Sequence, residues 1–236
     1  GKVRSENEDS IYIWENPDRE FEYFIVADGM GGHNAGEIAS QSAIKFFNEY
    51  IEDSCDIKDS SDLLDAFVGA LGYSNQKIFE MSQSSPSFRG MGTTFTAAAI
   101  CCGKVYCVHI GDSRLYIYNK NGLRQITKDH SFVMEMVRLG KITMEEARVH
   151  PKRNMITKAV GIEKNMPADT IITPLEKDSI ILVCSDGLSS MVTDREIEKI
   201  LKKKTGLDKK ADMLVGLANK NGGYDNISVI LADGKV

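Results

Sequence analysis

Short apolar runs that end at or beside an aspartate recur along this chain, and they constrain its fold more than any other feature. Several runs are apolar on both faces and rich in β-branched residues, which is typical of buried strands. They cover residues 10–14, 21–27, 93–101, 105–110, 115–119, 180–184 and 227–232. An aspartate at a strand end, next to glycine, is a carboxylate on a rigid scaffold with room beside it for an ion.

Helical periodicity appears between and after these runs. Residues 35–52 and 62–83 carry apolar side chains at helical spacing and predict two consecutive amphipathic helices. Helices are also predicted at 194–204, with Thr193 or Asp194 as its cap, and at 208–219.

The order of these elements favours an α+β fold, because the predicted strands follow one another in groups and the predicted helices lie between those groups in pairs. Antiparallel pairing is expected, and the close spacing of 93–101, 105–110 and 115–119 predicts a three-stranded meander. Residues 130–160 have weaker patterning, and we expect a helical flap there, beside the site. We expect residues 1–236 to form a single domain.

Composition narrows the function. The formal net charge of −5 argues against a nucleic-acid binder or a binder of anionic membranes, since phosphate-rich partners would be repelled. The five cysteines are odd in number and contain no C-x-x-C pair, so we expect a reduced, cytoplasmic protein. No apolar run approaches the roughly 18 residues needed to span a bilayer.

Five acidic fragments carry the candidate chemistry. They are Asn7-Glu8-Asp9, Asp28-Gly29-Met30-Gly31-Gly32-His33, Gly111-Asp112-Ser113-Arg114, Ser185-Asp186-Gly187 and Gly223-Tyr224-Asp225-Asn226. Carboxylate oxygens without accompanying Cys or paired His favour Mg²⁺ or Mn²⁺ over Zn²⁺. Asp28 and Asp186 each follow an apolar run and Asp225 precedes one, so neighbouring antiparallel strands would bring all three together.

A carboxylate cluster of this kind suits phosphoester hydrolysis. Two bridged divalent ions lower the pKa of a shared water and hold both oxygens of an in-line displacement at phosphorus. An arginine nearby would grip the non-reacting phosphate oxygens, and Arg4 is the candidate.

The chain resembles a known family, the metal-dependent serine/threonine protein phosphatases of type 2C, and in particular the bacterial branch of that family. The resemblance rests on ordered motifs that span nearly the whole chain. They are Arg4-x-x-Asn7-Glu8-Asp9, Asp28-Gly29-Met30-Gly31-Gly32-His33, Gly90-Met91-Gly92-Thr93-Thr94, Gly111-Asp112-Ser113-Arg114, Asp129-His130-Ser131, Cys184-Ser185-Asp186-Gly187-Leu188 and Gly222-Gly223-Tyr224-Asp225-Asn226-Ile227-Ser228.

The resemblance implies a four-layer αββα sandwich and a set of ion ligands. Two central antiparallel sheets would be flanked by helices, with Mn²⁺ or Mg²⁺ in a cleft at one end. Asp28 would bridge two ions, the Gly29 carbonyl would bind one of them, and Asp186 and Asp225 would hold the other. Asp9 would act near the second ion.

The same resemblance assigns the supporting roles. Asp112, with Asp186, would match a third and weaker ion position. Arg4 would bind the substrate phosphate, and Asn226 would support a water on the ions. Phosphorylated proteins would be the substrates, a serine/threonine kinase would oppose the enzyme, and we expect a monomer.

Two positions depart from the family pattern. Where relatives in the eukaryotic branch carry a histidine regarded as the proton donor to the leaving group, this chain has Met30. A water on the ions would then supply the proton, with His33 as the other candidate. Glu8 stands where bacterial relatives often carry glutamine.

Two other hypotheses stay open at this stage. One is a binding module that keeps the fold without turnover, although all the principal carboxylates are present here. The other keeps the enzyme but restricts it to one dedicated regulatory phosphoprotein in a stress or sporulation switch. A dinucleotide site is excluded because the third glycine of G-x-G-x-x-G would fall at Asn34.

Overall fold

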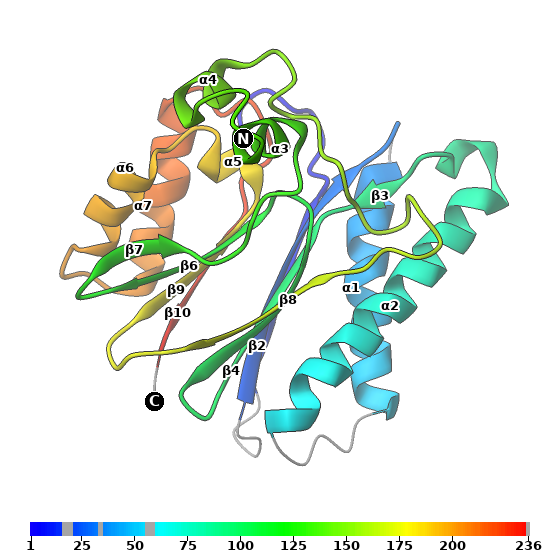
Figure 1. The fold of residues 1–236 in the computed structure, drawn as a ribbon, viewed down its shortest axis with the longest axis horizontal. Helices are drawn as coiled ribbons and strands as arrows, with labels where there is room; N and C mark the ends of the chain where they lie inside the picture. Colours follow the sequence, from blue (N-terminus) through cyan, green and yellow to red (C-terminus); the bar gives the residue numbers. More distant parts are fainter. Residues whose placement is uncertain (16–20, 33–34, 55–59, 235–236) are drawn as a thin grey trace.

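Two face-to-face antiparallel β-sheets form the centre of the protein, with helices on both outer faces (Figure 1). The computed structural model describes residues 1–15, 21–32, 35–54 and 60–234. The first sheet has the order β1-β2-β4-β5-β8, with β3 paired to β2, and the second has the order β10-β9-β6-β7. This arrangement confirms the predicted α+β, four-layer αββα sandwich.

The strands of the first sheet are β1 (Asp9–Trp14), β2 (Phe21–Met30), β3 (Gly92–Thr93), β4 (Phe95–Cys101), β5 (Lys104–Ile110) and β8 (Asp169–Pro174). Those of the second sheet are β6 (Arg114–Asn119), β7 (Gly122–Gln125), β9 (Ile180–Cys184) and β10 (Val229–Asp233). The helices are α1 (Ala35–Ser54), α2 (Ser60–Ser84), the short 3₁₀ helix η1 (Pro86–Phe88), α3 (Phe132–Arg138), α4 (Met144–Val149), α5 (Asp186–Ser189), α6 (Asp194–Leu201) and α7 (Leu207–Lys220).

Strand β2 shows how the apolar runs build three core layers. Its odd-numbered residues Tyr23 and Ile25 pack against α1 and α2, whereas Phe24 and Val26 point into the space between the sheets. All four are buried, which explains why the run is apolar on both faces rather than alternating. A third apolar layer lies between the second sheet and helices α5, α6 and α7.

The predicted meander is wrong at its third strand. Strands β4 and β5 do form a hairpin through Cys102 and Gly103, but β6 pairs with β9 and β7 in the other sheet. Gly111, with φ of +110°, lets the chain leave the first sheet at this point, a backbone angle that L-residues rarely adopt. Strands β7 and β8 were not predicted, because β7 is short and β8 is an edge strand with exposed side chains.

The expected flap between residues 130 and 160 is confirmed as helical. Ser131 caps α3, and Thr143 forms a capping box with Glu146 at the start of α4. Thr193 likewise caps α6 through a capping box, so of the two candidate caps it is the threonine that acts. Among the described helices, none combines the length and the apolar composition needed to cross a membrane.

Candidate metal and phosphate site

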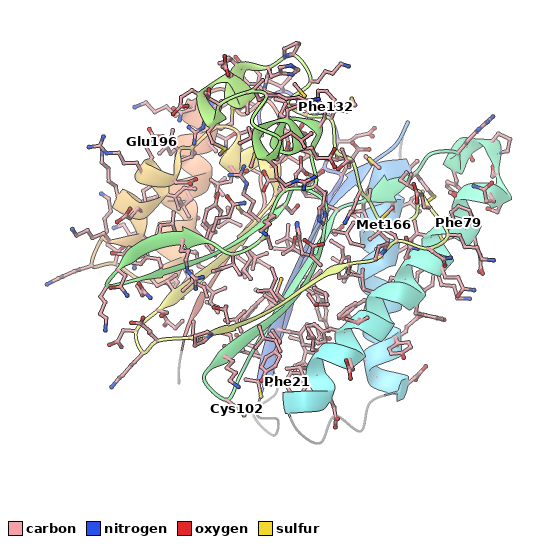
Figure 2. All side chains as sticks on the ribbon, viewed as in Figure 1. Phe21, Phe79, Cys102, Phe132, Met166 and Glu196 are labelled. Atoms are coloured by element: carbon pink, nitrogen blue, oxygen red, sulfur yellow. The ribbon has the colours of Figure 1, made fainter. Side chains whose placement is uncertain are left out.

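The acidic fragments converge at one end of the sandwich, where the chain passes between the two sheets. Asp9 begins β1 and stands directly opposite Asp28 on β2. Asp112 lies in the turn between β5 and β6, Asp186 begins α5 after β9, and Asp225 precedes β10. Figure 2 marks the flap side with Phe132 and the opposite end with Phe21 and Cys102.

Asp28 lies at the centre of this cluster. Its burial, together with the negative charges around it, raises the pKa of the Asp28 carboxyl well above its usual range. The charges that contribute belong to Asp9, Asp186, Asp112 and Asp225. All the predicted carboxylates therefore come within electrostatic reach of Asp28, and their charges disfavour its ionised form.

The neighbouring carboxyls respond in the same direction. Burial, and then the charge of Asp225, raises the pKa of Asp186 to about 6. Burial, followed by the charge of Asp186, raises the pKa of Asp112 well above its usual range. Burial also raises the pKa of Asp9. Perturbed acids gathered in one cleft are typical of a functional site.

Buried hydroxyl groups fix the backbone around these acids. Thr94 accepts a hydrogen bond from the Asp28 amide at 2.9 Å, and its side-chain oxygen lies 2.7 Å from that of Ser113. Ser185 donates to Asp9 Oδ2 at 2.7 Å and accepts from the Ser228 amide at 3.0 Å. Sequence reasoning did not single out Thr94 or Ser185, although both lie inside the family motifs.

Glycines at two points allow backbone segments to approach the site closely. A Cβ on Gly187 would overlap the carbonyl oxygen of Asn226, and a Cβ on Gly29 would overlap that of Gly36. The segment after Asp186 is thereby held against the segment after Asp225. Close packing therefore explains why glycine follows Asp28 and Asp186.

Arg4 and Asn226 tie the N-terminal segment to the cluster. Arg4 Nη2 donates to Asp225 Oδ2 at 3.0 Å, and its side chain is half exposed. The Asn226 amide group donates to the Glu6 carbonyl at 2.8 Å and accepts from the Glu8 amide at 3.0 Å. Asn226 thus positions the backbone next to Asp9, and its support of a water stays a prediction.

A cavity of about 240 Å³ opens over the cluster. It is lined by Arg4, Glu8, Asp28, Gly29, Met30, Gly31, Thr94, Asp112, Asn154, Ile156, Asp186 and Asp225. A second cavity of about 170 Å³ lies beside it under the flap and shares Asp112, Asn154 and Asp186 with it. The flap thus contributes Asn154 and Ile156, which sequence reasoning did not name.

The donor set fits hard divalent cations. The candidate side-chain ligands all offer carboxylate oxygens, which hard cations prefer. Among them, the buried Asp9 Oδ1 has no hydrogen-bond partner. Within the described ranges, no three His, Cys, Asp or Glu side chains are grouped as the ligands of one ion. Two of the acids are instead engaged by Arg4 and Ser185, so ligation requires their carboxylates to turn about single bonds.

Met30 and Glu8 are the two positions that depart from the family pattern, and His33 is the residue proposed as proton donor. Met30 lines the cavity and has no proton to give. His33 lies outside the described residues. Glu8 also lines the cavity, where burial, partly offset by the charge of Arg4, raises the pKa of its carboxyl.

Comparison with known proteins assigns the family. A family model described as protein phosphatase 2C matches residues 2–226. The chain belongs to the protein phosphatase 2C family. The sequence resemblance to this family is thereby confirmed, and its bacterial branch is supported by the relatives.

This phosphatase 2C chain is similar over nearly its full length to bacterial serine/threonine phosphatases. The serine/threonine phosphatase stp of Listeria monocytogenes is 38% identical over 233 residues, which are 99% of this chain and 92% of that protein. The structure of the Streptococcus agalactiae serine/threonine phosphatase has a TM-score of 0.91 at 38% identity, covering 98% of this chain and 94% of that one.

A second similar structure contains metal. The catalytic domain of the serine/threonine protein phosphatase PstP, solved with two manganese ions, has a TM-score of 0.86 at 36% identity. The match covers 99% of this phosphatase 2C chain and 94% of that one. The chain is a protein serine/threonine phosphatase that depends on divalent metal and acts on phosphoproteins.

Proposed function

We propose that the acidic cluster holds two divalent cations, Mn²⁺ or Mg²⁺, and that the enzyme hydrolyses phosphoserine and phosphothreonine by direct attack of water. Asp28 would bridge the two ions, the Gly29 carbonyl would bind one, and Asp186 and Asp225 would bind the other, with Asp9 close to the second ion. The observation that carries this proposal is the charge interaction of Asp28 with the other carboxylates of the cluster.

A third and weaker ion would bind at Asp112 and Asp186. Both carboxylates line the cavity over the cluster and the adjoining cavity under the flap. Burial and their mutual repulsion raise the pKa of the Asp112 carboxyl, so a cation between them would relieve an unfavourable contact.

The bound ions and the protein side chains would make different contributions to the reaction. When bound, two such ions lower the pKa of a water and offset negative charge at phosphorus. Asp28 on β2 and Asp186 at the start of α5 present their carboxyl groups to the cavity, and Arg4 can orient the non-reacting phosphate oxygens with its planar guanidinium. The water oxygen bonds to phosphorus in line with the departing serine or threonine oxygen, which takes a proton from water.

Isotope labelling tests the direct attack. One turnover of a phosphothreonine peptide in H₂¹⁸O, with Mn²⁺ present, is expected to give phosphate that carries one ¹⁸O atom, measured by mass spectrometry. Acid quenching during turnover is expected to trap no phosphorylated protein. A phosphorylated side chain, or phosphate without the label, would contradict direct attack while leaving the phosphatase activity intact.

Arg4→Ala is expected to lower kcat/KM for a phosphothreonine peptide by about 10- to 100-fold, mainly through KM. A hydrogen bond to a charged group contributes about 1.5–3 kcal/mol, and tenfold corresponds to about 1.4 kcal/mol. Arg4→Lys should recover part of this loss, since lysine keeps the positive charge but lacks the planar guanidinium that donates two parallel hydrogen bonds. Initial rates at saturating Mn²⁺ measure it.

Arg195→Ala on α6 is the matched control, since Arg195 is exposed and does not line the cavity. Its kinetics should equal those of the wild type. The thermal stability of Arg4→Ala should also be nearly unchanged, because the ion pair with Asp225 is partly exposed and such pairs contribute little. An unchanged KM in Arg4→Ala would remove Arg4 from the phosphate site.

The cellular role follows from the substrate class. We propose that the enzyme is a monomeric, single-domain, cytoplasmic protein that opposes a serine/threonine kinase. Its cysteine usage supports a reducing compartment. A dedicated regulatory phosphoprotein remains the alternative substrate, and it is favoured if intact candidate proteins are hydrolysed far faster than generic phosphopeptides.

A further inference from the structure

A histidine outside the acidic cluster clamps the turn that carries Asp112. The ring Nδ1 of His130 accepts a hydrogen bond from the Gly111 amide at 3.1 Å. In the opposite direction, the His130 amide donates to the Gly111 carbonyl at 2.7 Å. One residue thus satisfies both backbone groups of the glycine that precedes Asp112.

The position of Gly111 leaves it little freedom. Its φ of +110° is a conformation that other L-residues rarely adopt, and a Cβ there would collide with the side chain of Thr94. On the far side of Asp112, Ser113 is held by Thr94 at 2.7 Å. The turn is therefore fixed before Asp112 by His130 and after it by Thr94.

Further contacts hold the His130 ring in one orientation. Because Nδ1 accepts a hydrogen bond from the Gly111 amide, the ring proton sits on Nε2, which lies 3.3 Å from Asp169 Oδ2 on β8. The ring also stacks on His109, with the centroids 5.0 Å apart. The His109 ring is itself fixed by Thr96 at 2.9 Å.

The same residue connects this turn to the flap. The His130 carbonyl accepts a hydrogen bond from the Thr157 amide at 2.8 Å, and the next residue, Ser131, caps α3. Phe132, labelled in Figure 2, begins that helix. Through Thr157, His130 is bonded to the returning chain of the flap, and Asn154 in that segment lines the cavity beside Asp112.

We propose that His130 is a positioning residue, which holds the Gly111–Asp112 turn so that the Asp112 carboxylate faces Asp186 in the cavity. The inference rests on the proposed role of Asp112 as a ligand of the weaker ion. Groups that orient a ligand from outside typically change metal affinity or activity by about 10- to 100-fold when they are lost.

Two polar substitutions of His130 test whether its Nδ1 acceptor, and not another part of the ring, is the feature that matters. His130→Asn places its amide oxygen where Nδ1 stands, so it can still accept from the Gly111 amide. His130→Gln reaches toward Asp169 but has no acceptor at the Nδ1 position, which leaves the buried Gly111 amide unpaired. Both variants keep a polar side chain of similar size, so the comparison survives moderate loss of stability.

The measurement is a titration of metal-free protein with Mn²⁺ alone, followed by the electron paramagnetic resonance signal of free Mn²⁺. We expect His130→Gln to weaken the weakest Mn²⁺ by about tenfold or more, and His130→Asn to stay within about threefold of wild type. His150→Gln, a flap histidine that does not line the cavity, should bind Mn²⁺ as the wild type does.

Asp112→Asn separates the positioning role of His130 from the ligand role of Asp112. If Asp112→Asn weakens Mn²⁺ binding and His130→Gln does not, the positioning role is overturned and the ligand assignment stands. If Asp112→Asn has no effect, the ligand assignment fails and the positioning role fails with it. If His130→Gln weakens binding in the wild type but not in the Asp112→Asn background, the two residues act as one unit, as we propose.

Discussion

Asp186→Asn is expected to abolish metal-dependent activity while making the metal-free protein more stable. Bound ions of this kind supply several kcal/mol of transition-state stabilisation, and the loss of Asp186 as a proposed ligand should lower kcat/KM by about 10³-fold. Initial rates on a phosphothreonine peptide with EDTA, Mg²⁺ or Mn²⁺ measure this. Activity that is indifferent to EDTA in the wild type would contradict the metal mechanism.

The stability gain follows from the pKa of Asp186, which is raised to about 6. A raised folded-state pKa means that the carboxyl contributes stability below its unfolded pKa, near 4, and loses it as pH rises through about 6. At pH 7.5 the ionised Asp186 therefore costs the metal-free fold about 2–3 kcal/mol, which asparagine avoids. The melting temperature in EDTA should rise by several degrees at pH 7.5 and be unchanged near pH 4.

Asp212→Asn on α7 provides the matched control, since Asp212 is exposed and lies outside the cavity. It should change neither the activity nor the melting temperature. A metal-free Asp186→Asn protein that is less stable than the wild type at pH 7.5 would show that the cluster is not under net repulsion, and would sink the electrostatic account of the site.

Arg114→Met is expected to be the most destabilising single change away from the ion ligands, at about 3–5 kcal/mol. Arg114 makes three hydrogen bonds to Asp129, from 2.7 to 3.1 Å, and one to the Tyr116 hydroxyl at 2.8 Å. The Asp129 side chain is 7% exposed, so without its partner the carboxylate stays buried as an uncompensated charge. Urea unfolding in EDTA measures the loss independently of bound metal.

A second variant isolates the cause of that loss. Asp129→Asn added to Arg114→Met should recover about half of the stability, because the buried charge is removed and the Gln125 contact is kept. Lys120→Met breaks an exposed pair with Glu176 and should cost less than about 0.5 kcal/mol. Equal losses in Arg114→Met and Lys120→Met would refute the role of burial.

The sequence predicted most of the elements because their signals are local. The run at 180–184 is buried throughout and coincides with β9, and the periodic stretches at 35–52 and 62–83 lie within α1 and α2. Sheet membership is not local. Residues 115–119 have the same apolar character as their neighbours, yet they cross to the other sheet at Gly111, where only the backbone angle marks the change.

The candidate site could be predicted because its acids stand in ordered motifs, but the reason for their convergence could not. Asp28 and Asp186 were expected at the ends of neighbouring antiparallel strands, whereas β2 and β9 belong to different sheets. Thr94 and Ser185 lie inside the family motifs, but no pattern there indicates what their hydroxyl groups bind, and the flap residue Asn154 lies outside those motifs. Their roles depend on contacts between segments that are far apart in the chain.

The crossing of the chain between the sheets has a consequence for how the protein unfolds. Asp9 and Asp28 belong to one sheet, whereas Asp186 and Asp225 flank strands of the other, and nearly the whole chain separates Asp9 from Asp225. A cation held among them, as proposed, would join the two halves of the sandwich at an interface that only the native state contains. Chelators should therefore speed global unfolding as well as stop catalysis, so the lifetime of the folded enzyme in a cell becomes a function of its metal supply.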